Sequence, residues 1–176
     1  MKFKKAALAA ATAALGLGTL LSAPAVQAQA QEQFVPLLVY RTGQFAPLGI
    51  PWANGKQDYL KLVNAKGGVN GVKITFEECE TAYDTGKGVE CYERMKSRTG
   101  GTASFDTQST GITFAVSDKA PGDKATIVTT GYGLSQSADG RVFEWNFPLL
   151  GNYWTAADSM IQDILKKEKG SLKGKK

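Results

Sequence analysis

Apolar and polar positions along the chain alternate between the spacing of strands and the spacing of helices. Val35 to Tyr40 is a short apolar run, which predicts a buried strand, and the Gly- and Pro-marked segment Arg41 to Pro47 predicts a loop after it. The next segment predicts an amphipathic helix that ends at Gly67 and Gly68, where glycine permits a left-handed backbone. Its helically spaced positions are Trp52, Lys56, Tyr59, Leu60 and Val63.

The same alternation continues through the middle of the chain. Asn70-Gly71 predicts a turn, residues 72–79 alternate as a strand, and residues 84–98 carry Val89, Tyr92 and Met95 at helical spacing. Shorter elements follow: a strand over 102–105, a helix over 112–117 and a strand over 126–129.

Two further elements are predicted near the end of the chain. An aromatic strand contains Val142, Phe143, Trp145 and Phe147. An amphipathic helix then contains Ala157, Met160, Ile161, Ile164 and Leu165, and Thr155 with Asp158 resembles a capping box at its start.

This β-α alternation predicts an α/β fold, with a largely parallel sheet covered by helices on both faces in a Rossmann-like arrangement. Ligands of such sheets bind beyond the carboxyl ends of the strands. The loops expected to form a site are therefore 41–47, 106–111 and 130–140.

The first residues predict export. Met1 to Lys5 holds three lysines, and an uncharged apolar stretch runs to about Ala23 before small residues that permit cleavage after Ala28 or Ala30. A membrane anchor is disfavoured, because the stretch is short against the roughly 20 apolar residues of a span and contains two glycines. We expect residues 1–28 to be a cleaved signal peptide and the remainder to be one compact periplasmic domain.

Charge and composition exclude several classes of function. The net charge is +5, but residues 29–165 hold 12 Lys and Arg against 15 Asp and Glu, so no basic patch for nucleic acid is expected. The sequence has no histidine, which removes His-dependent nucleophilic catalysis and the commonest zinc ligand. We therefore expect no enzyme activity, no cofactor and no metal.

Cys79 and Cys91 are the only cysteines, and an even pair in an exported protein predicts a disulfide. The alternative, a redox pair, usually has C-x-x-C spacing, which is absent here. A structural bridge between a strand and the next helix is therefore the expectation.

Three other patterns are weak. The Gly-Lys in segment 84–88 lacks the other residues of a phosphate loop, and Gly131-Tyr132-Gly133 lacks the third glycine of a dinucleotide fingerprint. The acidic strand end around Glu77, Glu78, Glu80 and Asp84 lacks calcium-loop spacing, so we expect it to be solvated.

Ser109-Thr110-Gly111 is a candidate anion site, because hydroxyl and backbone N–H groups between a strand and a helix can hold a small carboxylate. The alternative is an ordinary helix cap, which the residue types alone favour.

The run from Asn64 to Ile74 resembles the helix-to-strand junction of the Leu/Ile/Val-type periplasmic binding proteins of ABC transporters, and segment 42–47 is similar to the loop after their first strand. The resemblance covers residues 34–176. It implies a monomeric two-lobe receptor that closes over a small solute and docks on an ABC transporter permease. By position it implies ligand contacts at Gln44, Phe45, Ser109, Thr110, Gly131, Tyr132 and Gly133.

The chain departs from the family in two ways. Gly133 stands where amino-acid binders often have threonine, so the solute is either a branched-chain amino acid or another small acid or amide. The chain also ends where a second lobe is expected to begin. We therefore interpret 29–165 as a first lobe and 166–176 as a basic segment leading to a missing second lobe in a truncated form, with a solvated tail as the alternative.

Two other functions remain open. The same fold could be the ligand-sensing domain of a membrane receptor. An exported α/β enzyme would need a nucleophile and base from Asp, Glu, Lys or Tyr, and no such pair is evident.

Overall fold

The computed structural model describes residues 32–98, 102, 104–130, 133 and 135–174. The predicted signal peptide and two of the predicted ligand residues, Gly131 and Tyr132, lie outside these ranges.

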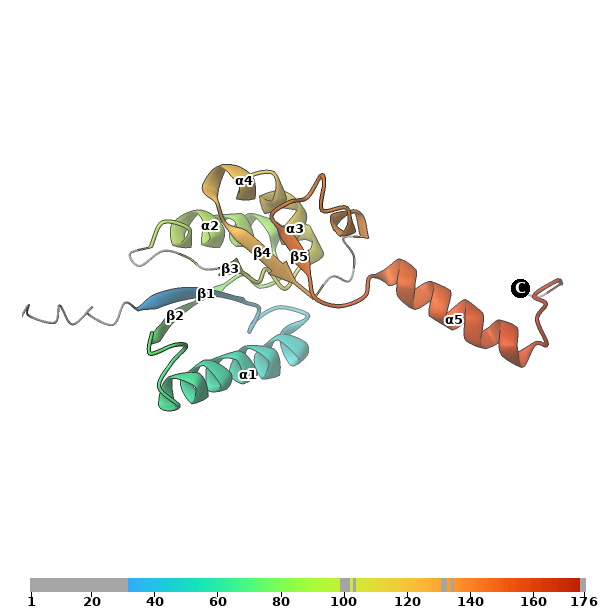
Figure 1. Cartoon of the computed structure of the whole chain (residues 1–176), viewed down its shortest axis with the longest axis horizontal. Coiled ribbons are helices and arrows are strands. Elements are labelled where there is room, and N and C mark those ends of the chain that lie inside the picture. The colour runs from blue at the N-terminus through green and yellow to red at the C-terminus, as the bar shows by residue number, and fades with distance from the viewer. Residues whose placement is uncertain (1–31, 99–101, 103, 131–132, 134, 175–176) are drawn as a thin grey trace, which may run out of the picture.

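A parallel sheet forms the centre of the body (Figure 1). β1 pairs with β2, β3 with β4 and β4 with β5, all in parallel. These pairings make a two-stranded and a three-stranded group. Isolated parallel bridges from Phe34 to Thr102 and from Leu37 to Asp106, on either side of β3, connect the two groups in the order β2-β1-β3-β4-β5. The strands are β1 (Gln33–Val39), β2 (Ile74–Glu80), β3 (Ser104–Phe105), β4 (Thr126–Thr129) and β5 (Asn146–Pro148).

Helices lie on both faces, which confirms the predicted fold class. α1 (Ala46–Ala65) covers one face, while α2 (Thr85–Met95), α3 (Thr110–Ser117) and the short α4 (Ala120–Asp123) lie on the other (Figure 1). A 3-10 helix, η1 (Ser135–Ala138), follows β4, and α5 (Tyr153–Lys167) projects away from the body.

The longest helix, α1, starts earlier than the sequence predicted and ends where the sequence predicted. α1 begins at Ala46 because Pro47 fits the first turn, and it continues through Pro51 at the loss of one backbone donor. Its end is set by left-handed Gly67 and Gly68. The Asn64 side chain then bonds both the N–H and the C=O of Ile74, at 2.8 and 2.7 Å, and so ties the end of α1 to the start of β2.

The main core lies between the sheet and helices α2 and α3. Phe105 and Ile127 from the sheet are fully buried there with Tyr92, Met95 and Ile112 from the helices. Cys79 of β2 and Cys91 of α2 form the predicted disulfide, with their Cα atoms 5.8 Å apart.

Two predictions about the end of the chain are wrong. The aromatic strand contains only residues 146–148, because the N–H groups of Val142 and Phe143 bond back to Asp139 in a turn. The cap of α5 is Asn152, whose side chain accepts from the N–H of Thr155 at 3.0 Å; Thr155 lies inside the first turn.

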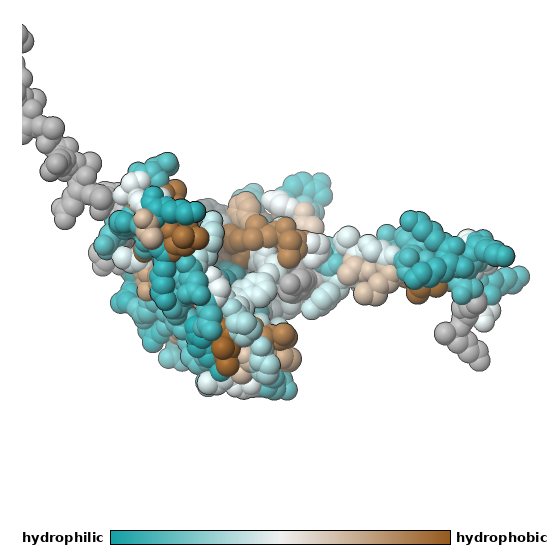
Figure 2. All heavy atoms as spheres, turned by 90° about the horizontal axis from the view of Figure 1, so that it is seen from below, coloured by the Kyte–Doolittle hydropathy of each residue, from teal (hydrophilic) through white to brown (hydrophobic). Residues whose placement is uncertain are grey.

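Helix α5 keeps an exposed apolar face. None of its residues is buried, and Trp154 and Met160 are 76% and 66% exposed. Seen from the α1 side, apolar side chains are visible on the body as well as on α5 (Figure 2). No helix within the described part of the chain is long and apolar enough to cross a membrane.

Candidate functional site

The candidate site is the sheet edge at which the strands have their carboxyl ends. Because neighbouring strands are parallel, the loops that follow β1, β2, β3 and β4 all leave from this edge. Of the predicted ligand residues that the structure describes, Gln44 and Phe45 follow β1, Ser109 and Thr110 stand at the start of α3 after β3, and Gly133 follows β4.

The loops after β1 and β2 are held together by Glu80. Its carboxylate accepts from the backbone N–H groups of Arg41 and Ala82, at 2.9 and 2.7 Å, and from the Thr42 hydroxyl at 3.2 Å. Gly43, at φ +82°, lies so close that an added Cβ would be 3.2 Å from the Ala82 carbonyl oxygen. The acidic strand end is therefore part of the loop architecture and not simply solvated as expected.

A second acidic residue holds the Arg41 side chain. Its guanidinium donates to both carboxylate oxygens of Glu78, at 2.8 and 2.6 Å, and to Asn54 at 2.8 Å. The Arg41 hydrogen bonds hold the pKa of the Glu78 carboxyl below its ordinary value; partial burial opposes this shift, and a hydrogen bond from Gln57 adds to it. The pair fixes the start of the β1–α1 loop and satisfies the charge of the guanidinium.

Aromatic side chains from both loops pack at this edge. The ring of Phe45 lies 4.6 Å from that of Tyr83, and the ring of Tyr40 packs edge-on against Tyr83 at 5.1 Å. Tyr83 is left-handed at φ +63°. Phe45 remains 38% exposed and Gln44 is exposed, and a ligand contact from either residue stays a prediction. Sequence reasoning missed Tyr83, which no motif marks.

Ser109 forms the helix cap that its residue type favours. It is the N-cap of α3, and its hydroxyl accepts from the N–H of Ile112 at 3.4 Å. The residue is only 6% exposed, and its carbonyl accepts from the N–H and the hydroxyl of Thr113. The cap interpretation is confirmed, and a ligand contact from Ser109 stays a prediction.

Thr110 and Gly133 bring the loops after β3 and β4 together. A Cβ on Gly133 would lie 2.6 Å from Thr110 Oγ1, which is closer than the Cβ atoms of proteins approach other atoms. Glycine at this position therefore lets the β4 loop lie directly against the first turn of α3. The departure from the threonine often found in the family has a local steric reason.

Gly133→Ala is expected to disturb this contact and lower the free energy of unfolding by about 1–3 kcal/mol, the usual range for overpacking. Thr110→Ala removes the two atoms nearest to the added Cβ, Oγ1 at 2.6 Å and Cγ2 at 2.8 Å. The double variant should therefore recover much of the loss in urea denaturation. If the double variant instead loses as much free energy of unfolding as the two single variants together, the loops do not meet.

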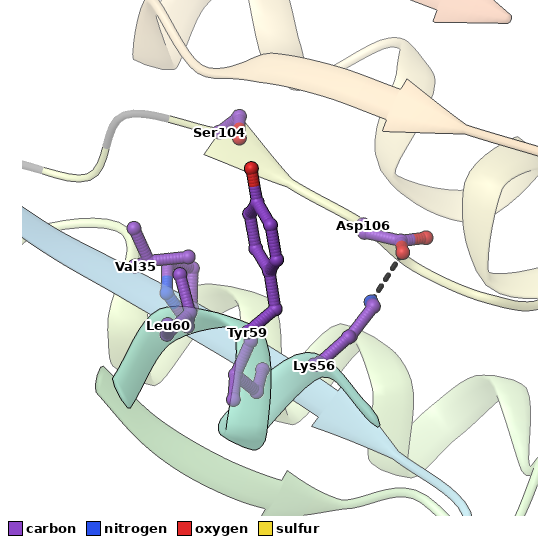
Figure 3. A pocket seen from close by; sticks show the side chains of 8 residues that line it. Val35, Lys56, Tyr59, Leu60, Ser104 and Asp106 are labelled. Carbon is purple, nitrogen blue, oxygen red and sulfur yellow. Dashed lines mark hydrogen bonds and ion pairs between the residues drawn. The ribbon is translucent and has the colours of Figure 1, made fainter. Parts of the chain in front are cut away.

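A pocket of about 170 Å³ lies on the α1 face of the sheet (Figure 3). Its walls are mainly apolar, and Lys56 of α1 forms an ion pair with Asp106, which directly follows β3. The lining residues are Val35, Pro36, Leu37, Lys56, Tyr59, Leu60, Ser104 and Asp106. They are far apart in sequence, so no local pattern could have predicted the pocket.

Within the described ranges, no group of His, Cys, Asp and Glu side chains is arranged to hold a metal ion.

Comparisons with known proteins agree on one family. A family model described as periplasmic binding protein matches residues 32–174. Among curated proteins, none matches the chain.

Solved structures share the fold. The chain is 37% identical to a protein described as an ABC transporter permease from the Pseudomonas fluorescens group, with TM-score 0.72 over 80% of this chain and 34% of that one. It is 27% identical to an ABC transporter substrate-binding protein of Aeropyrum pernix, with TM-score 0.65 over 77% and 35% of the two chains.

A third structure supports the fold alone. It is the branched-chain amino acid transporter substrate-binding protein of Streptococcus pneumoniae in complex with isoleucine, 14% identical, with TM-score 0.58 over 66% of this chain and 33% of that one. The chain thus spans about a third of the length of these similar proteins. With a family match over most of its length and the parallel sheet of one lobe, the chain belongs to the periplasmic binding protein family of ABC transporters.

Proposed function

We propose that this chain is the solute-recognition lobe of an extracytoplasmic substrate-binding protein, and that it binds a branched-chain amino acid or a related small carboxylate or amide. The observation that carries the proposal is the contact between Thr110 and Gly133, which brings the loops after β3 and β4 together at the carboxyl edge of the sheet. Phe45, on the loop after β1, adds an exposed aromatic ring.

The chemistry of this edge suits a small polar solute. Arg41 and Lys56 are paired with Glu78 and Asp106, so neither is free to bind an anion. A solute carboxylate would then be held by the Thr110 hydroxyl and backbone N–H groups, which make strong hydrogen bonds to anions. Phe45 and Tyr83 would pack against its apolar part.

The rest of the proposed function concerns the whole protein. Substrate-binding proteins of this kind close two lobes over the solute, and this chain corresponds to one lobe. A second lobe would lie opposite the strand-end loops. The receptor would be a monomer, and its docking partner would be an ABC transporter permease. Residues 1–28 would direct the chain out of the cytoplasm.

A thermal-shift measurement tests the proposal. The chain from residue 29 is heated with branched-chain amino acids, short-chain acids and their amides. A bound solute at 100 times its Kd should stabilise the native state by about 2.7 kcal/mol. Thr110→Val should remove most of the shift, whereas Thr155→Val, an exposed substitution on α5, should keep it. If no compound shifts the wild-type melting temperature, or if both variants behave alike, the proposal is wrong.

A further inference from the structure

One face of the sheet is covered over only part of its width. On this face α1 packs over β1 and β2, where Leu37, Val39 and Ala53 are buried. Within the described part of the chain, β3, β4 and β5 have helices packed on their other face and none on the α1 side (Figure 1). Parallel strands are normally buried on both faces, so this part of the sheet lacks a cover.

The uncovered part of the sheet is apolar. The Asn146 side chain of β5 bonds to α3 at 2.8 Å, so the next residue, Phe147, points to the α1 side. Val128 of β4 is the register partner of Phe147 and shares this face. Leu149 continues the pairing of β5 with β4 and again points to the α1 side. We call Val128, Phe147 and Leu149 the bare strand face; Phe147 is 50% exposed and Leu149 69%.

The pocket of Figure 3 lies at the boundary between α1 and this face. Leu60 of α1 and Val35 of β1 line one side, and Ser104 and Asp106 of β3 line the other. Phe105 stands between these two residues and points into the core, so Ser104 and Asp106 belong to the α1 face. A helix lying beside α1 would therefore find a hollow for one apolar side chain.

Helix α5 is the kind of element that such a face needs. Its apolar side chains recur every three or four residues and form one stripe, which contains Trp154, Met160, Ile161 and Ile164. A helix of 15 residues is marginal alone in water, and most of its stability in a protein comes from packing an apolar stripe. In its own chain α5 points away from the body (Figure 1). Each copy thus carries an uncovered sheet face and an uncovered helix.

We propose that this chain forms a symmetric dimer in which α5 of each copy lies on the bare strand face of the other, beside α1. The exchange is reciprocal, so both apolar surfaces are covered in both copies and the contact closes with twofold symmetry. The inference concerns this one-lobe chain by itself and goes beyond the proposed function. Solute binding uses the strand-end loops, so either proposal can fail without the other.

The exposed apolar surface is large enough for a stable dimer. A specific interface buries about 1,000 Å² or more in total, and one aromatic side chain can supply about 150–250 Å². Each contact occurs twice in the dimer, so the area covered should exceed about 1,000 Å². The side chains that supply it in each copy are Phe147, Leu149, Trp154, Met160, Ile161 and Ile164.

Sedimentation equilibrium of the chain from residue 29 tests the proposal, and a concentration-dependent monomer–dimer equilibrium is expected. Met160→Lys and Leu149→Lys should each weaken the dimer by roughly a hundredfold, because the dimer would bury each lysine twice. The matched controls are Ser159→Lys, on the polar side of α5, and Phe114→Lys, on α3 across the sheet; both should dimerise like the wild type. All four side chains are exposed, so circular dichroism should show folded variants.

Hydrogen exchange then locates the contact. The α5 amides of the wild type should exchange as those of a lone helix in dilute solution and more slowly as the dimer forms, and Leu149→Lys should abolish that slowing. A chain that stays monomeric at every concentration overturns the proposal. A dimer that is lost in Met160→Lys but kept in Leu149→Lys would mean that the two helices pair with each other, and equal weakening in the controls would mean non-specific association; both results also overturn it.

Discussion

Removing the Cys79–Cys91 disulfide is expected to lower the free energy of unfolding by about 3 kcal/mol, the stabilisation expected for closing a loop of this length. The change is Cys79→Ala with Cys91→Ala, and both positions are nearly fully buried. The bridge joins the C-terminal end of β2 to α2, next to the loop that Glu80 holds. Urea denaturation of the double variant measures the loss.

Reduction of the wild-type chain provides the control for this experiment. Wild type with an excess of dithiothreitol should unfold at nearly the same urea concentration as the double variant, because both lack the covalent link. If the free energy of unfolding falls by less than about 1 kcal/mol in either sample, the covalent link adds little to the stability that packing already provides.

Phe105→Ala is expected to have a similar or larger effect, a loss of about 3–5 kcal/mol. Phe105 is fully buried, and its ring packs 4.6 Å from that of Tyr92 of α2. β3 is only two residues long, so this side chain is its main attachment to the core. Because β3 leads directly to Ser109 and Thr110 at the start of α3, the proposed solute binding should be lost together with stability.

Phe147→Ala is the matched control, because Phe147 also lies in a strand of the sheet but is 50% exposed. Its truncation should lower the free energy of unfolding by less than about 1 kcal/mol, as for most exposed positions. Equal losses in the two variants would contradict the position of the core between the sheet and helices α2 and α3.

Most of the fold could be predicted because its signals are local. β4 lies where the pattern placed it, at Thr126–Thr129, since its side chains alternate between buried and part-buried. The disulfide was predicted from the cysteine count and the predicted export. The shortened β5 could not be predicted, because the same apolar alternation occurs in the turn before it, where backbone N–H groups bond to Asp139.

The candidate site was predictable in position and less so in detail. Parallel strands place their carboxyl-end loops at one edge whatever the residues are. The contacts of Glu80 and the backbone conformation of Gln108 depend on partners that are remote in sequence or belong to the backbone. Glu80 accepts from the Arg41 N–H, 39 residues away, and Gln108 is held by Asp106, which in turn pairs with Lys56, 50 residues away. No local pattern contains such contacts.

The projecting helix α5 has a consequence for how this chain unfolds. A helix of 15 residues is close to the shortest that persists alone in water, and none of the α5 side chains is buried against the body. Its backbone amides should therefore exchange with deuterium at a rate set by the helix-coil equilibrium of α5 alone, independently of the sheet. Any surface that covers Trp154, Met160 and their apolar neighbours would slow this exchange and reveal the contact, amide by amide.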